Sequence, residues 1–301
     1  MHNRPMPHIC AIITAYGSNA TAVQHCITTL NKQSCKPADI IIAADANDSE
    51  QPSSKIPLHM VQANSPAEGR AKGMQLAFED LKADYVWELE ADSAPDKHCL
   101  QALLNAKGED DCVCLPLCLS TADTPAQPLC IQSNGSKQVI LNTEDLPHSE
   151  RVELAHILPG GLYPRSAWMR AGCPTPQLIM QGEMEEYAAK LCSEGFSLQL
   201  VHSAKLRYTN TAEYLCYRAG NELFTYRIGK TLEEHYYRMR NRAWIERVIR
   251  RKQYLRRLIS CGFYMLNTLR AMLQSGEFSI KRAYLVFRGQ HNGFYGKLRP
   301  Y

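Results

Sequence analysis

The chain has 301 residues with 45% hydrophobic content, which is enough for a sizeable core and for one large α/β domain with an appendage. Its twelve cysteines are scattered, and the closest pair, Cys112 and Cys114, has no second paired motif, so we expect reduced thiols and assign no zinc site. The formal net charge of +4 is small but unevenly distributed along the chain.

The positive charge is concentrated in residues 238–257, which contain nine basic residues and one acidic residue, Glu246. Apolar residues such as Trp244 and Ile249 lie between the arginines. This pattern fits an amphipathic helix on an anionic membrane surface, and a solvated helix packed on the domain is an equally open alternative. No nucleic-acid recognition module accompanies the charge, so we expect no nucleic acid partner.

Two segments bear on localisation. Residues 1–7 lack the apolar region and cleavage site of a secretory signal. Residues 258–273 form the longest apolar stretch, but Asn267 and Arg270 interrupt it before it reaches the length of a spanning helix. We therefore expect a cytoplasmic protein that can bind peripherally to the inner face of the cell membrane.

Apolar segments alternate between strand-like and helical patterns through the first part of the chain. Continuous apolar runs that predict buried strands occupy residues 9–14, 40–44 and 85–89, and a weaker strand is predicted at residues 58–62. Helical spacing of apolar residues is found at residues 22–30 and 71–81. This order predicts a parallel sheet with right-handed crossovers, in which ligands bind beyond the carboxyl ends of the strands.

Acidic residues follow two of these strands. Glu90 and Asp92 come directly after the strand at residues 85–89, where two carboxylates spaced by one residue can hold one divalent cation. Mg²⁺ and Mn²⁺ prefer oxygen ligands and can bridge them to a diphosphate. Carboxylates are also common in loops at strand ends, so this pattern alone does not decide the function.

Further motifs occur in a characteristic order. The order comprises a strand ending at Thr14 and Tyr16, an L-x-x-Q-x-x-x-P pattern at residues 30–37, a strand ending at Asp45, and a Gly- and Arg-containing turn at residues 64–73. It continues with Leu89-Glu90-Ala91-Asp92-Ser93-Ala94-Pro95, a helix start at residues 181–190, and closing elements at residues 214–221 and 289–297. In this order the sequence resembles the family 2 glycosyltransferases with a GT-A fold over most of its first 225 residues. The pattern around Glu90 and Asp92 is similar to the galactofuranosyl- and rhamnosyltransferase-like branch.

The resemblance implies an α/β GT-A nucleotide-diphospho-sugar transferase fold over residues 1–225, with a mainly parallel central sheet flanked by helices. A basic, mainly helical C-terminal extension is expected over residues 226–301. The implied activity is that of an inverting hexosyltransferase, which moves a sugar from a nucleoside diphosphate sugar to a hydroxyl of a growing cell-surface glycan, such as lipopolysaccharide O-antigen or capsule. The acceptor is a glycan or a lipid-linked glycan.

The same resemblance implies the residues of the site. Mn²⁺ or Mg²⁺ is expected on Asp92 and Glu90. The residues expected to contact the donor are Thr14, Tyr16, Asp45, Asn64, Arg70, Glu90 and Gly161. For the glycines at 69 and 73, a simple packing role is an open alternative.

The departures from the family pattern concern the metal and the base. Glu90 stands where the family has an Asp, and Met184 stands where it has its usual general base, so the base is expected to be Glu183 or, as an alternative, Glu185. A metal-ligating His of the family corresponds to Tyr208, and His202 is near but out of register. These departures leave open a catalytically impaired homologue that acts as a binding or scaffold subunit.

Overall fold

The computed structural model describes residues 6–16, 20–45, 52–107, 111–133, 136–154, 156–180, 182–208, 214–219, 222–250 and 252–299. The chain forms two compact units. Unit 1 contains Met1–Pro174 and Lys190–Thr211, and unit 2 contains Thr175–Ala189 and Ala212–Tyr301. The division into domains at residue 225 stays a prediction, because compactness alone does not identify an independently folding domain.

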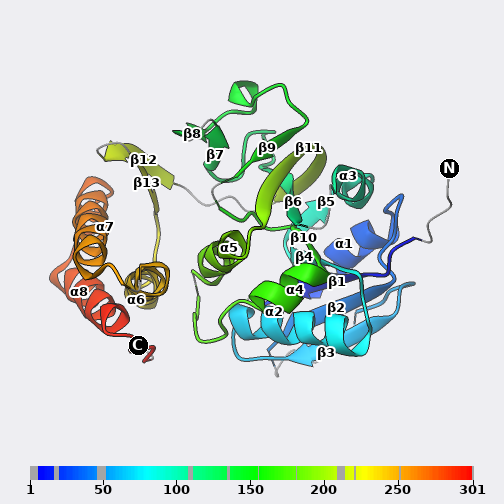
Figure 1. The fold of residues 1–301 in the computed structure, drawn as a ribbon, viewed down its shortest axis with the longest axis horizontal. Helices are drawn as coiled ribbons and strands as arrows, with labels where there is room; N and C mark the ends of the chain where they lie inside the picture. Colours follow the sequence, from blue (N-terminus) through cyan, green and yellow to red (C-terminus); the bar gives the residue numbers. More distant parts are fainter. Residues whose placement is uncertain are drawn as a thin grey trace. The chain divides into compact units, whose positions relative to one another are not determined.

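Unit 1 is built around one large sheet (Figure 1). Among the described residues its strands follow the order β3-β2-β1-β4-β10-β6-β11-β5, and β9 pairs with β11. The pairs β3–β2, β2–β1, β1–β4 and β6–β11 are parallel, which confirms the predicted mainly parallel α/β architecture. The strands are β1 (Ile9–Thr14), β2 (Asp39–Ala44), β3 (Leu58–Gln62), β4 (Tyr85–Glu90), β5 (Ser93–Pro95), β6 (Cys112–Leu119), β9 (Arg151–Glu153), β10 (Leu162–Pro164) and β11 (Ser197–Tyr208).

The sequence of β1 explains its central position. All six residues of this strand are buried, as the continuous apolar run requires of a strand covered on both faces. Thr14, its last residue, is in register with Ala43 on one side and Glu90 on the other. The carboxyl ends of three neighbouring parallel strands therefore meet at one edge of the sheet.

Short helices complete unit 1. They are α1 (Ala20–Asn31), α2 (Pro66–Gln75), the π-helical turn η1 (Leu76–Asp80), α3 (Cys99–Ala106), the 3₁₀ turn η2 (Thr143–Asp145) and α4 (Arg165–Ala171). A separate hairpin pairs β7 (Leu129–Ser133) with β8 (Ser136–Ile140). Helix α2 packs against β1, β2 and β3, so its amino end lies beside the edge at which the strands finish.

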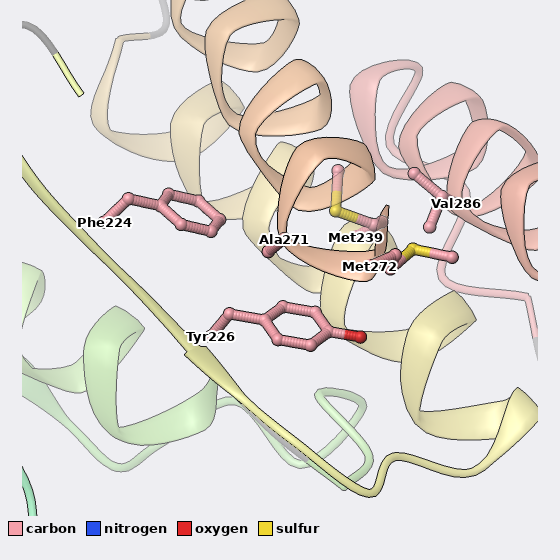
Figure 2. Packing of buried hydrophobic residues seen from close by; sticks show 6 residues of the cluster. All are labelled: Phe224, Tyr226, Met239, Ala271, Met272 and Val286. Atoms are coloured by element: carbon pink, nitrogen blue, oxygen red, sulfur yellow. The ribbon is translucent and has the colours of Figure 1, made fainter. Parts of the chain in front are cut away.

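Unit 2 combines a hairpin with helices. The hairpin pairs β12 (Tyr214–Ala219) with β13 (Glu222–Arg227), and the helices are α6 (Leu232–Ile249), α7 (Tyr254–Gln274) and α8 (Ile280–Phe294). Helix α5 (Glu183–Ser193) contributes residues to both units. The core of unit 2 is formed by Phe224, Tyr226, Met239, Ala271, Met272 and Val286 (Figure 2).

Two glycines bring α8 into direct contact with α6. A Cβ atom added at Gly289 would collide with the carbonyl oxygen of Tyr236, and one added at Gly293 would collide with that of Arg240. Only glycine leaves room for two helix backbones at this distance. The glycines of the closing motif therefore have a packing role.

The structure corrects the expectation of one basic amphipathic helix over residues 238–257. Helix α6 ends at Ile249 and α7 begins at Tyr254, so the segment is divided between two helices. Arg240 is fully buried and donates hydrogen bonds to the carbonyl oxygens of Gln177 and Arg299, at 2.8 Å each. Arg238 is also buried and bonds to the hydroxyl of Tyr264. These two arginines stabilise unit 2 and cannot face a membrane.

A search of the described helices finds none with the length and apolar character needed to cross a membrane.

Candidate functional site

The candidate site lies in unit 1, at the carboxyl ends of β1 and β4. The backbone amide of Ala91 donates a hydrogen bond to the carbonyl oxygen of Thr14, at 3.1 Å, so the turn after β4 is fixed to the end of β1. This turn carries Asp92, and Glu90 is the last residue of β4. The register of the sheet therefore brings Thr14, Glu90 and Asp92 to one edge.

Arg70 connects this edge to helix α2. It is 4% exposed, and its Nε donates to the Oε1 of Glu88 at 2.8 Å. Its Nη2 donates to the Oε1 of Glu90 at 3.2 Å. One guanidinium group thus orients two carboxylates, spaced by two residues on the same face of β4.

Glu88 is a site residue that the motif comparison did not identify. Its side chain is fully buried, and within the described part of the chain its Oε2 has no hydrogen-bond partner. The Oγ1 of Thr14 is likewise buried without a partner among the described residues. Because buried polar atoms are normally satisfied, such atoms at strand ends indicate a place that a ligand or ordered water completes. The signal in the sequence was an acidic residue inside an apolar strand.

The carboxylates of Glu90 and Asp92 are in an unusual electrostatic environment. Burial, partly offset by Arg70 and increased by the negative charges of Glu88 and Asp92, raises the pKa of Glu90 to about 7. Burial also raises the pKa of Asp92. The side chain of Glu90 is nevertheless 37% exposed, so it remains accessible to a ligand. A cation bound here would favour the charged forms of both groups.

Tyr208 lies beside these carboxylates, at the end of β11. It is in register with Ser93 of β5, directly after Asp92. Burial and the charge of Glu90 hold the pKa of its hydroxyl well above the usual range. Tyr208 therefore occupies the place at which the resemblance implied a metal-ligating histidine.

His202 lies elsewhere. It is six residues before Tyr208 on β11, at the point where the pairing of β11 with β6 shifts register between Val201 and Lys205. His202 lines a cavity of about 490 Å³ together with Lys205 and Arg207, and neither Glu90 nor Asp92 is among the residues lining this cavity. The structure thus separates His202 from the carboxylates.

The amino end of α2 is stabilised by its own residues. Ser65 is the N-cap, and its hydroxyl accepts a hydrogen bond from the amide of Glu68 at 3.2 Å. The carboxylate of Glu68 accepts from the backbone and side-chain amides of Asn64, at 2.9 and 3.1 Å. Asn64 therefore has a capping role here, and its contact with a donor stays a prediction.

Gly69 permits α2 to approach β2 and Tyr16. A Cβ atom added at Gly69 would lie 2.9 Å from the Cβ of Ala43 and 3.0 Å from the ring and hydroxyl of Tyr16. Burial, together with the nearby charges of Glu68 and Asp45, raises the pKa of Tyr16 to about 12. A neutral Tyr16 hydroxyl therefore lies close to the ends of β1 and β2.

Gly161 and Asp45, the two other residues expected to contact the sugar donor, differ in solvent exposure. Gly161 is buried, and its carbonyl oxygen accepts from the amide of Glu88 at 2.9 Å, so it supports the middle of β4. Asp45 is exposed directly after β2, and residues 46–50 lie outside the described residues. Close to Asp45, a cavity of about 510 Å³ is lined by Ala15, Ala44 and residues of α1, β2 and β3. Its volume is in the range of small-ligand sites.

The expected bases belong to unit 2. Glu183 is buried in the first turn of α5, and Glu185 is exposed in the same turn. The intervening Met184 is only partly buried. The roles of Glu183 and Glu185 stay predictions.

The donor set at Glu90 and Asp92 fits Mn²⁺ or Mg²⁺, which are bound in many enzymes by one or two carboxylates together with substrate phosphates. Among the described residues, three ligand-type side chains come within 4.8 Å of one another only at His8, Cys10 and Asp39. There, the two carboxylate oxygens of Asp39 contact the Nε2 atoms of His8 and His59, at 2.8 Å each. That cluster lies at the opposite end of β1 and β2 from the strand ends described above.

The chain is similar to a known protein family and to solved structures. Residues 10–153 match the family described as Glycosyl transferase family 2. The chain is similar to GalNAc-T7, crystallised with UDP, GalNAc and Mn²⁺, with 12% identity and a TM-score of 0.58; the match covers 98% of this chain and 57% of that chain. It is also similar to S. aureus TarS, with 12% identity, a TM-score of 0.47 and coverage of 79% and 39%. No curated protein matches the chain.

The likeness to GalNAc-T7 shows a GT-A fold. The chain spans less than two thirds of the length of either solved protein. The galactofuranosyl- and rhamnosyltransferase-like branch stays a prediction.

The buried pair of Arg70 and Glu88 generates a prediction about stability. Arg70→Met leaves Glu88 buried without its cation, and we expect the free energy of unfolding to fall by about 3–5 kcal/mol. In the double variant Arg70→Met/Glu88→Leu, both charges are replaced by apolar groups, and we expect the loss to shrink to about 1 kcal/mol or less. Urea unfolding of the purified chain measures both values.

Lys72→Met is the matched control, because Lys72 lies on the same helix and makes an ion pair with Glu68 near the surface. This change should alter the free energy of unfolding by less than about 0.5 kcal/mol. If the single and double variants lost the same stability, Glu88 would not depend on Arg70.

Proposed function

We propose that this chain transfers a sugar from a nucleoside diphosphate sugar to a hydroxyl group of a glycan, with inversion at the anomeric carbon. The observation that carries the proposal is the carboxylate pair Glu90 and Asp92 at the end of β4, in which Glu90 is oriented by Arg70 of α2. The family match over residues 10–153 and the GT-A fold support the same class of reaction.

The donor end of the site is assigned to unit 1. Glu90 and Asp92 would hold a Mn²⁺ or Mg²⁺ ion, which would neutralise the charge that develops on the leaving diphosphate. The GalNAc-T7 crystal contains UDP and Mn²⁺, and we propose the same classes of ligand here. Thr14 offers a buried hydroxyl at the adjacent strand end. Tyr16 and Asp45 follow the ends of β1 and β2, where we propose that the nucleoside binds.

Arg70 acts on the position of the carboxylates and not on the sugar. Its guanidinium is buried and bonded to Glu88 and Glu90, so it limits the side-chain rotamers that Glu90 can adopt. Keeping Glu90 in one position lowers the entropy that is lost when the ligand binds.

For the acceptor, we propose Glu183 as the general base. As general base, Glu183 takes the proton from the acceptor hydroxyl, the acceptor oxygen bonds to the anomeric carbon, and the bond from that carbon to the diphosphate breaks. Its burial in the first turn of α5 limits competition from water. Glu185, which is exposed, is the alternative base.

The wider assignment follows from this reaction. We propose a cytoplasmic enzyme that extends a cell-surface glycan carried on a lipid, in the galactofuranosyl- or rhamnosyltransferase-like branch. The alternative is a homologue that binds the donor but does not transfer the sugar, and the departures at Glu90, Met184 and Tyr208 favour it. The following two experiments separate these alternatives.

Donor binding is tested by thermal unfolding with MnCl₂ and a panel of UDP, GDP and dTDP. At a nucleotide concentration of 100 Kd, binding should add about 2.7 kcal/mol, and each kcal/mol should raise Tm by roughly 2–4 °C. Asp92→Asn should abolish this shift, because it removes a charged ligand of the ion. Asp80→Asn, which changes an exposed acid on η1, is the control and should keep the shift. Absence of any shift in the unsubstituted chain would contradict the donor assignment.

Catalysis is tested by release of nucleoside diphosphate from the nucleotide sugar that gives the largest thermal shift, with water as acceptor. Glu183→Gln should lower the rate ~10²–10⁴-fold, as expected for loss of a general base, and should leave the thermal shift unchanged. Glu185→Gln is the matched control in the same helical turn and should change the rate less than about threefold. Binding without any turnover in the unsubstituted chain, with lipid-linked glycan present or absent, would identify the non-catalytic alternative.

A further inference from the structure

Helix α7 of unit 2 has a large apolar face directed outward. Leu255, Ile259, Leu266 and Leu273 are 67, 63, 64 and 62% exposed, and Leu258 and Phe263 are exposed as well. In an α-helix with 3.6 residues per turn, these six positions fall on one side. The exposed apolar stripe runs from Leu255 to Leu273, or about 27 Å along the helix.

The opposite face of α7 packs within unit 2. Ala271 and Met272 pack into the core of unit 2, and Figure 2 shows them among the other residues of this cluster. The remaining buried positions of the helix are Cys261, Asn267 and Thr268. Tyr264, Met265 and Leu269 of α7 also pack against this core. The helix therefore has apolar side chains on its inner face and a second set of large apolar side chains on its outer face, which packing within unit 2 leaves uncovered.

Helix α8 repeats this arrangement. Ile280, Tyr284 and Phe287, at positions i, i+4 and i+7, are exposed on one side of the helix, with Ile280 at 85%. Lys281 and Arg288 are exposed next to them. Figure 1 shows α7 and α8 as neighbouring helices of unit 2.

The segment that contains the exposed faces of α7 and α8 is strongly basic. Residues 247–301 contain twelve Lys and Arg residues and a single acidic residue, Glu277. Glu277 is engaged within unit 2, where it accepts hydrogen bonds from the hydroxyl of Tyr226 and the amide of Gly229, at 2.8 Å each. Arg256 and Arg270 are exposed on α7 itself. Two copies of such a surface would repel one another, whereas an anionic surface with an apolar interior complements both features.

We propose that the outer faces of α7 and α8 dock unit 2 onto an anionic lipid bilayer, with α7 lying in the plane of the interface. The exposed Leu, Ile and Phe side chains enter the boundary between head groups and acyl chains, and the flanking Arg and Lys side chains contact the anionic head groups. The sequence alone predicts a membrane surface formed by the arginines of residues 238–257. The surface proposed here is formed instead by the exposed apolar side chains of α7. It deepens the proposed function by placing the enzyme at a lipid-linked acceptor, but lipid binding itself does not require the transferase activity.

The test is co-sedimentation of the full chain with sucrose-loaded vesicles of 70% phosphatidylcholine and 30% phosphatidylglycerol, the composition chosen to supply ~30% anionic head groups. The double variant Ile259→Glu/Leu266→Glu should lower the partition coefficient by roughly tenfold or more, because each change places a carboxylate in the apolar stripe. Pure phosphatidylcholine vesicles and raised salt should weaken binding of the unsubstituted chain.

Met169→Glu is the matched control, since Met169 is an exposed apolar residue on α4 of unit 1 and lies outside the proposed surface. It should bind vesicles as the unsubstituted chain does, and so should Asp92→Asn, which separates lipid docking from donor binding. Circular dichroism and Tm check that the double variant is folded. Equal partition of the double variant and the unsubstituted chain would overturn the proposal. So would a stable dimer in light scattering that Ile259→Glu/Leu266→Glu dissociates, because a second copy would then cover the stripe.

Discussion

The site depends on one buried arginine. Arg70, held on α2, donates to Glu88 and Glu90 and thereby fixes two like-charged side chains on adjacent positions of one face of β4. Without this cation, two carboxylates at the edge of a buried sheet would repel one another and would cost several kcal/mol to desolvate. The close approach of α2 that brings Arg70 into place depends in turn on Gly69, where a Cβ atom would meet Ala43 and Tyr16. The geometry of the donor end is therefore decided by helix packing as much as by the strand that carries the acids.

Much of unit 1 follows from local sequence patterns. The apolar runs at residues 9–14, 40–44 and 85–89 predict strands that the structure contains, because a strand buried on both faces requires such a run. The basic segment at residues 238–257 shows where local reasoning fails. A count of charges cannot reveal that Arg240 caps carbonyl groups inside unit 2, or that the outward face of the next helix is aliphatic. Both properties depend on which side of each helix the fold covers.

The candidate site was predictable in part. Glu90 and Asp92 are recognisable because a pair of acids directly follows an apolar strand, and the sheet register places them beside Thr14. Glu88 was not recognised, because its importance arises from a contact with a helix eighteen residues away in the sequence. Asn64 and Gly161 show the converse. Both were expected to contact the donor, yet each has a structural role here, in capping α2 and in supporting β4. A sequence motif identifies a residue, but only the structure shows which of its hydrogen-bonding groups are already engaged within the fold.

The central claim is that Asp92 and Glu90, of which Glu90 is oriented by Arg70, bind a divalent cation that carries a nucleoside diphosphate. The most direct measurement is a crystal structure of the chain with MnCl₂ and the nucleotide that binds best, with anomalous scattering recorded at the manganese edge. The account predicts a single strong peak within coordination distance, about 2.0–2.6 Å, of oxygen atoms of Asp92 and Glu90 and of the diphosphate. A peak located instead at His8 and Asp39, or a diphosphate bound at the ends of β1 and β4 with no ion beside these two carboxylates, would contradict it.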